Sequence, residues 1–237
     1  MSNKLRCSIV MPSFNEVEAL RKTLYQIIEN VKVDYECIVV VDSEDDLSCQ
    51  VTRSFQIENK SVSLVINSIK KGPAGAMKSG IQSSRGDVVV IVSADGSDDS
   101  TQIDDLVKLV ERGVAIASAS RYMHGGRLVN SPLLKGLFSR LAGLSLHYIK
   151  RIGTRDATNN FKAYSRSFLE QIRIESEFGF EVGLELTVKA SRLRLPIAEI
   201  PTIWIERSVG SSKFKLWASL PKYLRWYFYG LGIRIKK

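Results

Sequence analysis

The chain has 237 residues, and its 34 Lys and Arg against 25 Asp and Glu give a formal charge of +9 with both histidines neutral. A hydrophobic fraction of 44% with 25% charged residues is ordinary globular composition and excludes a mainly disordered chain. The basic excess favours an anionic partner, such as a nucleotide, a lipid phosphate, a membrane surface or a nucleic acid.

Apolar runs rich in β-branched residues alternate with helical patterns over residues 7–117. The predicted strands are 7–11, 37–41, 62–66, 88–92 and 114–117, and the predicted helices between them are 16–30, 47–57, 74–84 and 101–112. This alternation is typical of βαβ units. We therefore predict an α/β fold with an open, mainly parallel sheet flanked by helices, which binds ligands beyond the carboxyl ends of its strands.

After Ser120 the pattern changes to a glycine-bearing loop at 121–127, a helix at 132–150, a helix at 180–192 and a strand at 200–205. Residues 214–237 combine aromatic and basic side chains, which is typical of an interfacial helix, although a terminal helix docked on the core is the alternative. We divide the chain into a domain at 1–213 and this segment at 214–237.

Three cysteines, Cys7, Cys37 and Cys49, show no C-x-x-C spacing, so neither a disulfide framework nor a zinc site is indicated. No apolar run reaches the ~18 residues of a membrane-spanning helix. The first residues also lack the apolar segment of a signal peptide. We expect a cytoplasmic protein.

Polar, acidic segments follow three predicted strands, at 12–16, 42–46 and 93–99. The carboxylate of Asp95 suits Mg²⁺ or Mn²⁺, hard cations that bridge protein oxygens to substrate phosphates. Asp98 and Asp99 also suit the cap of a helix that begins near Thr101. Asp42 is placed to accept a hydrogen bond from a ribose or a base, or to end the strand in a turn.

Two basic segments carry glycine. Residues 70–75 precede a helix, where backbone N–H groups favour phosphate. Residues 207–213 combine Arg, Ser, Gly and Lys, a composition suited to phosphate oxygens and also to a solvated loop.

Seven short motifs, in order and with compatible spacing, resemble glycosyltransferase family 2 with the GT-A fold. They are 9–16 with its P-x-x-N-E turn, 39–42 ending in Asp, 71–87 with K-G and R-G-D, 120–126 (S-R-Y-x-x-G-G), 156–161 (D-x-T-x-x-F), Glu185, and 207–213 (R-x-x-G-x-S-K). The chain is most similar to the dolichol-phosphate or polyprenyl-phosphate mannosyltransferase branch, over residues 7–213.

This resemblance implies a Rossmann-like domain that binds a nucleotide sugar, and it assigns the site residues. Pro12, Phe14, Glu16, Asp42 and Lys71 would hold the nucleotide, and Asp95 with Ser97 would hold Mg²⁺ or Mn²⁺. Arg121, Lys135, Ser139, Arg207 and Lys213 would neutralise the phosphates of donor or acceptor.

The reaction implied is inverting transfer of a hexose from GDP-mannose or a UDP-sugar to a polyprenyl phosphate, or to another lipid-linked or glycan acceptor. We expect it on the cytoplasmic face of a membrane that the protein contacts peripherally. A phosphate acceptor is already ionised, so positioning and charge stabilisation suffice. A hydroxyl acceptor would need a base, and Asp98, Asp156 and Glu185 are the candidates.

The chain departs from the family pattern at Ser93, which replaces the first carboxylate of D-x-D, at Ser43, which replaces the second Asp of a D-D pair, and at Lys135, which stands for Arg. These departures leave open a catalytically impaired protein that binds nucleotide sugars or acts as a scaffold. A nucleic-acid binder rests on the +9 charge alone, without a recognised module.

Overall fold

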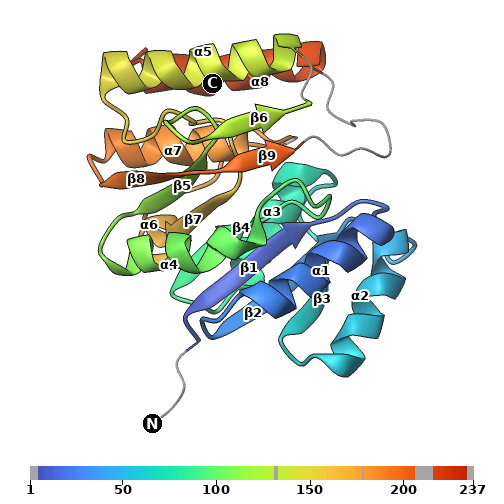
Figure 1. Cartoon of the computed structure of the whole chain (residues 1–237). Helices are drawn as coiled ribbons and strands as arrows, with labels where there is room; N and C mark the ends of the chain where they lie inside the picture. Colours follow the sequence, from blue (N-terminus) through green and yellow to red (C-terminus); the bar gives the residue numbers. More distant parts are fainter. Residues whose placement is uncertain (1–4, 131–132, 178, 206–215, 234–237) are drawn as a thin grey trace.

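The computed structural model describes residues 5–130, 133–177, 179–205 and 216–233 (Figure 1). In chain order the elements are β1 (Cys7–Pro12), α1 (Glu18–Asn30), β2 (Tyr35–Val41), α2 (Leu47–Glu58), β3 (Val62–Ile66), α3 (Pro73–Ser83), β4 (Val88–Ile91), the 3₁₀ turn η1 (Ser100–Gln102), α4 (Ile103–Glu111), β5 (Ile116–Ser120), β6 (Arg127–Val129), α5 (Leu133–Lys150), β7 (Lys162–Ser165), α6 (Arg166–Gln171), α7 (Val182–Arg192), β8 (Ile197–Pro201), β9 (Ile203–Ile205) and α8 (Leu216–Gly230).

The described residues form a seven-stranded sheet in the order β3-β2-β1-β4-β7-β5-β8. Its strands run parallel except β7, which pairs antiparallel with both β4 and β5. The predicted open, mainly parallel sheet is therefore confirmed. The antiparallel β7 was not predicted, because Lys162 opens this short strand and interrupts the apolar pattern that marks a buried strand.

The predicted strand at 200–205 is wrong, because the structure divides it between two sheets. β8 pairs with β5, whereas β9 pairs with β6 in a separate two-stranded ribbon. The break falls at Thr202, whose N–H donates to Ser120 O at 3.0 Å and whose carbonyl accepts from Arg127 N at 2.9 Å. The strand predicted at 114–117 also lies later, at Ile116–Ser120.

Helices cover both faces of the sheet, as the alternation of side chains along the strands requires. In β1, Ile9 and Met11 pack on the face covered by α1, α2 and α4, and Val10 packs on the face covered by α3, α6 and α7. All three cysteines are free and buried, and they pack in the first apolar cluster as small core residues.

Two further helices form an outer layer beyond α7. α5 and α8 lie side by side at one end of the molecule (Figure 1), and a third apolar cluster joins them to α7 through Leu146, Leu184, Val188 and Trp226. The indole of Trp226 is 3% exposed, and its Nε1 donates to Ser176 Oγ at 2.9 Å. The C-terminal helix is thus docked on the body of the protein.

Candidate functional site

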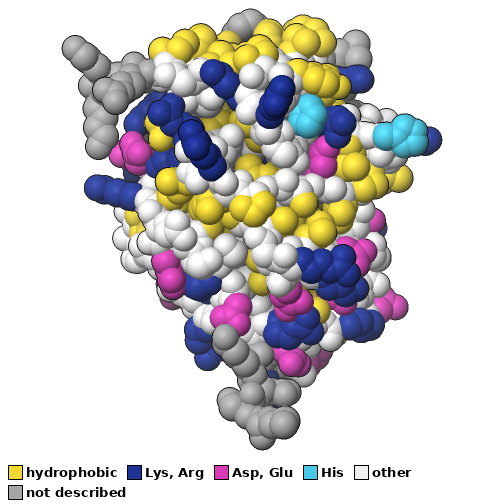
Figure 2. Space-filling view, turned by 90° about the vertical axis from the view of Figure 1, so that its left-hand side faces the viewer, with side chains coloured by type: hydrophobic (Ala, Val, Ile, Leu, Met, Phe, Trp, Pro, Cys, Tyr) yellow, Lys and Arg dark blue, Asp and Glu magenta, His cyan; other side chains and the backbone are white. Residues whose placement is uncertain are grey.

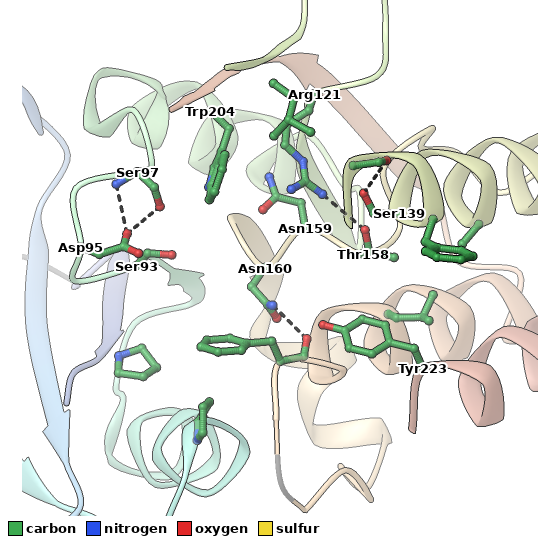
Figure 3. Close-up of a pocket in the computed structure, with 18 of the residues that line it drawn as sticks. Ser93, Asp95, Ser97, Arg121, Ser139, Thr158, Asn159, Asn160, Trp204 and Tyr223 are labelled. Atoms are coloured by element: carbon green, nitrogen blue, oxygen red, sulfur yellow. Dashed lines mark hydrogen bonds between the residues drawn. The ribbon is translucent and has the colours of Figure 1, made fainter. Parts of the chain in front are cut away.

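A cavity of about 780 Å³ opens at the carboxyl ends of the central strands and continues between α5 and α8 (Figure 3). Its wall includes Pro12 at the end of β1, Asp42 after β2, Asp95 after β4 and Arg121 after β5. This position is the one that the strand topology predicts for the ligand of an open α/β sheet.

One end of the cavity, which we call the donor end, contains four of the five predicted nucleotide-binding residues: Pro12, Phe14, Glu16 and Asp42. The loop after β1, which carries Phe14 and Glu16, is fixed by the start of α2. Asp46 accepts from Asn15 N, at 2.9 Å and 3.1 Å to its two oxygens, and Ser48 Oγ accepts from Glu16 N at 3.0 Å. Asn15 has φ 53°, a left-handed conformation that Asn tolerates better than most residues. The Asn of the P-x-x-N-E motif therefore shapes this turn.

The carboxylate of Asp42 is held by the segment between β3 and α3. Its Oδ1 accepts from Asn67 Nδ2 and its Oδ2 from Gly72 N, both at 2.7 Å. Sequence analysis did not select Asn67, although its position directly after a strand end was the available signal. Lys71 is exposed and does not line the cavity, so its assignment to the nucleotide stays a prediction.

Asp95 projects from the β4–η1 loop into the cavity wall beside Ser93 and Ser97 (Figure 3). Ser97 donates to Asp95 Oδ1 through its N–H at 3.1 Å and its hydroxyl at 2.6 Å. No group of three or more His, Cys, Asp or Glu side chains converges on a metal position in the described ranges. One carboxylate with neighbouring hydroxyls still fits a hard cation, because Mg²⁺ takes many of its ligands from substrate phosphates and water.

Asp99 has the capping role that the sequence left open for both residues, whereas Asp98 holds the backbone of Ser93 instead. Asp99 accepts from Thr101 N at 3.0 Å and caps η1. Asp98 is buried and accepts from Ser93 N at 2.8 Å. Burial, with the nearby charge of Asp95, raises the pKa of Asp98 to about 6, although the Ser93 hydrogen bond opposes the rise.

Arg121 lines the middle of the cavity and forms a buried ion pair with Asp156. Its Nε and Nη2 donate to the two carboxylate oxygens at 2.6 Å and 2.8 Å, and its backbone N–H adds a third bond at 3.0 Å. Burial favours the neutral forms, but the mutual attraction outweighs it. The pKa of Arg121 lies above its ordinary value and that of Asp156 below, so both are charged.

Beyond Arg121 the cavity becomes mostly apolar, and we call this part the acceptor end. Its wall consists of Leu128, Phe138, Leu141, Ala142, Leu184, Trp204, Leu220, Tyr223, Leu224 and Tyr227, with Ser139, Ser145, Thr158, Asn159 and Asn160 as polar members. Ser139 Oγ is hydrogen-bonded to the Tyr122 hydroxyl and donates to Gly136 O at 3.1 Å. Among the described lining residues, carboxylates occur at the donor end alone.

The three candidate general bases do not line the cavity. Glu185 is fully buried and accepts from Glu175 N, Ser176 N and Lys189 Nζ, so it holds the segment before α7. Of the other predicted residues, Arg207 and Lys213 lie outside the described residues, as does the side chain of Lys135 on α5.

The fold and the cavity define an α/β protein with a ligand site at the carboxyl ends of its central strands. The sequence model described as "Glycosyl transferase family 2" matches residues 8–173. The chain belongs to this family and is a glycosyltransferase.

Two curated relatives are similar over most of the chain. The undecaprenyl-phosphate mannosyltransferase of Micrococcus luteus is 31% identical over 216 residues, covering 88% of this chain and 87% of that protein. The dolichol-phosphate mannosyltransferase of Pyrococcus furiosus is 28% identical, covering 89% of this chain, which spans 60% of that protein's length.

Solved structures share the fold. The glucosyl-3-phosphoglycerate synthase of Mycobacterium tuberculosis, crystallised with Mn²⁺, UDP and glucosyl-3-phosphoglycerate, gives a TM-score of 0.72 at 16% identity, covering 98% of this chain and 81% of that one. The same enzyme with Mg²⁺ and UDP gives 0.70 at 18% identity. The predicted GT-A fold is confirmed.

Proposed function

We propose that this glycosyltransferase moves a hexose from a nucleotide sugar to a polyprenyl phosphate, with inversion at the anomeric carbon. The observation that carries the proposal is the acceptor end of the cavity, which is apolar, borders Arg121 and is lined by no carboxylate among the described residues. A hydroxyl acceptor would need a base within hydrogen-bond reach. A phosphate monoester carries its nucleophilic charge already, and an isoprenoid chain fits apolar walls.

The names of both curated relatives, which describe mannosyl transfer to undecaprenyl phosphate and dolichol phosphate, support the same acceptor class. For the donor, the solved neighbours with bound UDP support a nucleoside diphosphate. Mannose with GDP and a UDP-linked hexose are the two donors to test.

In the proposed reaction an acceptor phosphate oxygen attacks the anomeric carbon while the bond from that carbon to the leaving diphosphate oxygen breaks. Asp42 and Glu16 orient the nucleotide, and Arg121 offers positive charge between the two phosphate groups. Asp95 with Ser97 would hold Mg²⁺ or Mn²⁺, which when bound supplies positive charge to the departing diphosphate. Preorganised charge and positioning therefore account for the catalysis.

The test offers the purified protein GDP-mannose or UDP-glucose with Mn²⁺ and either a polyprenyl phosphate or the matching polyprenol, with the products followed by mass spectrometry. We expect glycosylated polyprenyl phosphate and no product from the polyprenol. Transfer to the polyprenol, or to a glycan hydroxyl at comparable rate, would overturn the acceptor assignment.

Ser93 at the first position of the metal motif supports one other candidate, a protein that binds the nucleotide sugar without turnover. Thermal stability against a panel of nucleoside diphosphates and nucleotide sugars, with and without Mn²⁺, separates the two, because a ligand of the native state raises stability by mass action. A metal-dependent shift together with turnover favours the enzyme. A shift without turnover over many acceptors favours the binding module.

We also propose peripheral contact with a membrane through α5 and α8. Large apolar side chains are exposed on these helices: Leu134, Leu137, Phe138, Leu141, Tyr148, Ile149, Leu224 and Phe228. Figure 2 shows hydrophobic side chains gathered at this end of the molecule, with Lys and Arg close by. No helix of the described ranges is long and apolar enough to cross a membrane. An anionic cytoplasmic leaflet suits a surface that combines apolar and basic groups.

A further inference from the structure

The segment that joins β3 to α3 is organised by the side chain of Asn67. Asn67 follows β3 directly, and its backbone N–H donates to Val41 O at 2.7 Å, which places it beside Asp42 at the ends of two neighbouring strands. Its Nδ2 donates to Asp42 Oδ1 and to Lys70 O, both at 2.7 Å. Its Oδ1 accepts from Ile69 N at 3.0 Å and from Ser79 Oγ at 2.8 Å.

These four bonds use the whole hydrogen-bonding capacity of a carboxamide, which has two donor hydrogens and two acceptor lone pairs. They also fix its orientation. The reverse orientation would set the amide oxygen against the Asp42 carboxylate and the Lys70 carbonyl, two acceptors, and the NH₂ group against the Ile69 N–H, a donor. Asn is thus the side chain that satisfies every neighbour here.

The same segment closes on Asp42 from its other side. Gly72 N donates to Asp42 Oδ2 at 2.7 Å, and Gly72 has φ 113°, a conformation that favours glycine. The carbonyl of Lys70 packs closely against α3 at Gly75, where an added Cβ would lie 1.7 Å from Lys70 O, so only glycine leaves room for this segment. Both oxygens of Asp42 are therefore held by the same segment.

Asp42 lines the cavity and Asn67 does not. We infer that Asn67 is a positioning residue for donor binding, which fixes the Asp42 carboxylate in the orientation that receives the nucleotide. This inference rests on the proposed nucleotide-sugar donor. It predicts that the strength of nucleotide binding depends on the amide at position 67 through Asp42.

The substitution Asn67→Asp keeps the shape of the side chain but sets a second carboxylate against Asp42 and Lys70 O. Two carboxylates at hydrogen-bond distance do not both ionise easily. They therefore share a proton when the pH falls. Acidification would therefore restore an O–H···O bond between positions 67 and 42. The matched control is Asn59→Asp, which precedes β3 at its opposite end, where Asn59 Oδ1 accepts from Ser61 N and a carboxylate oxygen can accept the same bond.

The experiment is titration calorimetry of GDP and UDP with Mn²⁺ into the wild type, Asn67→Asp and Asn59→Asp, at about pH 7.5 and about pH 5.5. Relative to the wild type at the same pH, we expect Asn67→Asp to bind at least about tenfold more weakly at the higher pH and to recover at the lower pH. Asn59→Asp should match the wild type at both. In turnover assays the donor KM should rise while the acceptor KM stays unchanged.

If Asn67→Asp does not fold, the substitution Asn67→Ala still tests whether nucleotide binding depends on the amide at position 67. It should weaken nucleotide binding with no recovery at low pH, because it introduces no second carboxylate. If the wild type binds nucleotide and both Asn67 variants bind it with the same affinity, the inference is overturned while the proposed donor stands. Failure of the wild type to bind any nucleotide would overturn the proposed donor and the inference together.

Discussion

The two ends of the cavity are stabilised in different ways. At the donor end, the polar side chains of Asn15, Asp46 and Asn67 fix the loops through hydrogen bonds to the backbone, two of which join residues 31 and 32 positions apart. The acceptor end is bordered by the buried ion pair of Arg121 and Asp156, 35 positions apart, and within it Ser145 on α5 is hydrogen-bonded to Tyr227 on α8, 82 positions further on. The donor end is therefore organised by hydrogen bonds between polar side chains and loop backbone, whereas the acceptor end depends on buried charge and on the packing of α5 against α8.

The largest expected effect is on the acceptor end, from Asp156→Ala. This substitution leaves the Arg121 guanidinium buried without its counter-ion, which typically costs about 3–5 kcal/mol of unfolding free energy. The control is Asp105→Ala on α4, whose ion pair with Lys108 at 3.1 Å is exposed and is expected to contribute less than about 1 kcal/mol. Urea denaturation measures both. Equal losses in the two variants would show that the buried pair does not organise the acceptor end.

At the donor end, Asp95→Asn should lower the rate of transfer by about 10²–10³-fold, because the cation site loses its carboxylate while the side chain keeps its shape. Asp99→Asn, in the same loop, should leave the rate unchanged because Asn caps a helical turn as well as Asp does. Initial rates at saturating donor with Mn²⁺ make the comparison. Retained activity in Asp95→Asn would reject the metal assignment.

A third prediction concerns Lys162, which lies beneath the middle of the cavity. It is fully buried and its Nζ donates to Ala157 O at 3.1 Å and to Asn159 O. Burial lowers its pKa from 10.5 to about 7, although the charge of Asp156 opposes the shift and that of Arg121 adds to it. Between these two pH values the unfolded chain binds a proton that the native protein does not.

The stability of the wild type relative to Lys162→Met should therefore rise with pH across this window, by at most about 1.4 kcal/mol per pH unit. Urea unfolding of both proteins from about pH 7 to about pH 10 checks the slope, and the subtraction removes groups that titrate in both. A difference that stays constant over this range would contradict the lowered pKa.

The smallest effect is expected on the outer surface of the acceptor end. Leu137 on α5 is 52% exposed, so Leu137→Glu should leave stability nearly unchanged while weakening binding to anionic vesicles about tenfold. The matched control is Ile57→Glu on α2. Ile57 is 87% exposed in the wild type, and this variant should bind the vesicles as the wild type does. Sedimentation with phosphatidylglycerol vesicles measures the partition. Equal binding by the two variants would reject α5 as the contact surface.

Much of the donor half could be predicted from the sequence. Strand periodicity located β1 to β4, and the segments at the strand ends together with the family resemblance identified Pro12, Glu16, Asp42 and Asp95, all of which line the cavity. The hydrogen bonds of Asn67 could not be predicted, because they depend on how far the segment after β3 folds back over Asp42.

The acceptor half was less predictable. β7 begins with a lysine, and the segment at 200–205 reads as one strand although its two halves pair in different sheets. In both cases the partner strand, which the local sequence does not encode, decides the outcome.

The sequence by itself determined the family, the alternation of strands and helices, and the polar residues at the strand ends, because these follow from local periodicity and from motif order. The tertiary structure alone decided that α8 docks on α7 through Trp226, that Asp156 forms an ion pair with Arg121, and that the candidate bases do not line the cavity. Burial and charge pairing between distant segments set these features, and they emerge only when the chain is packed.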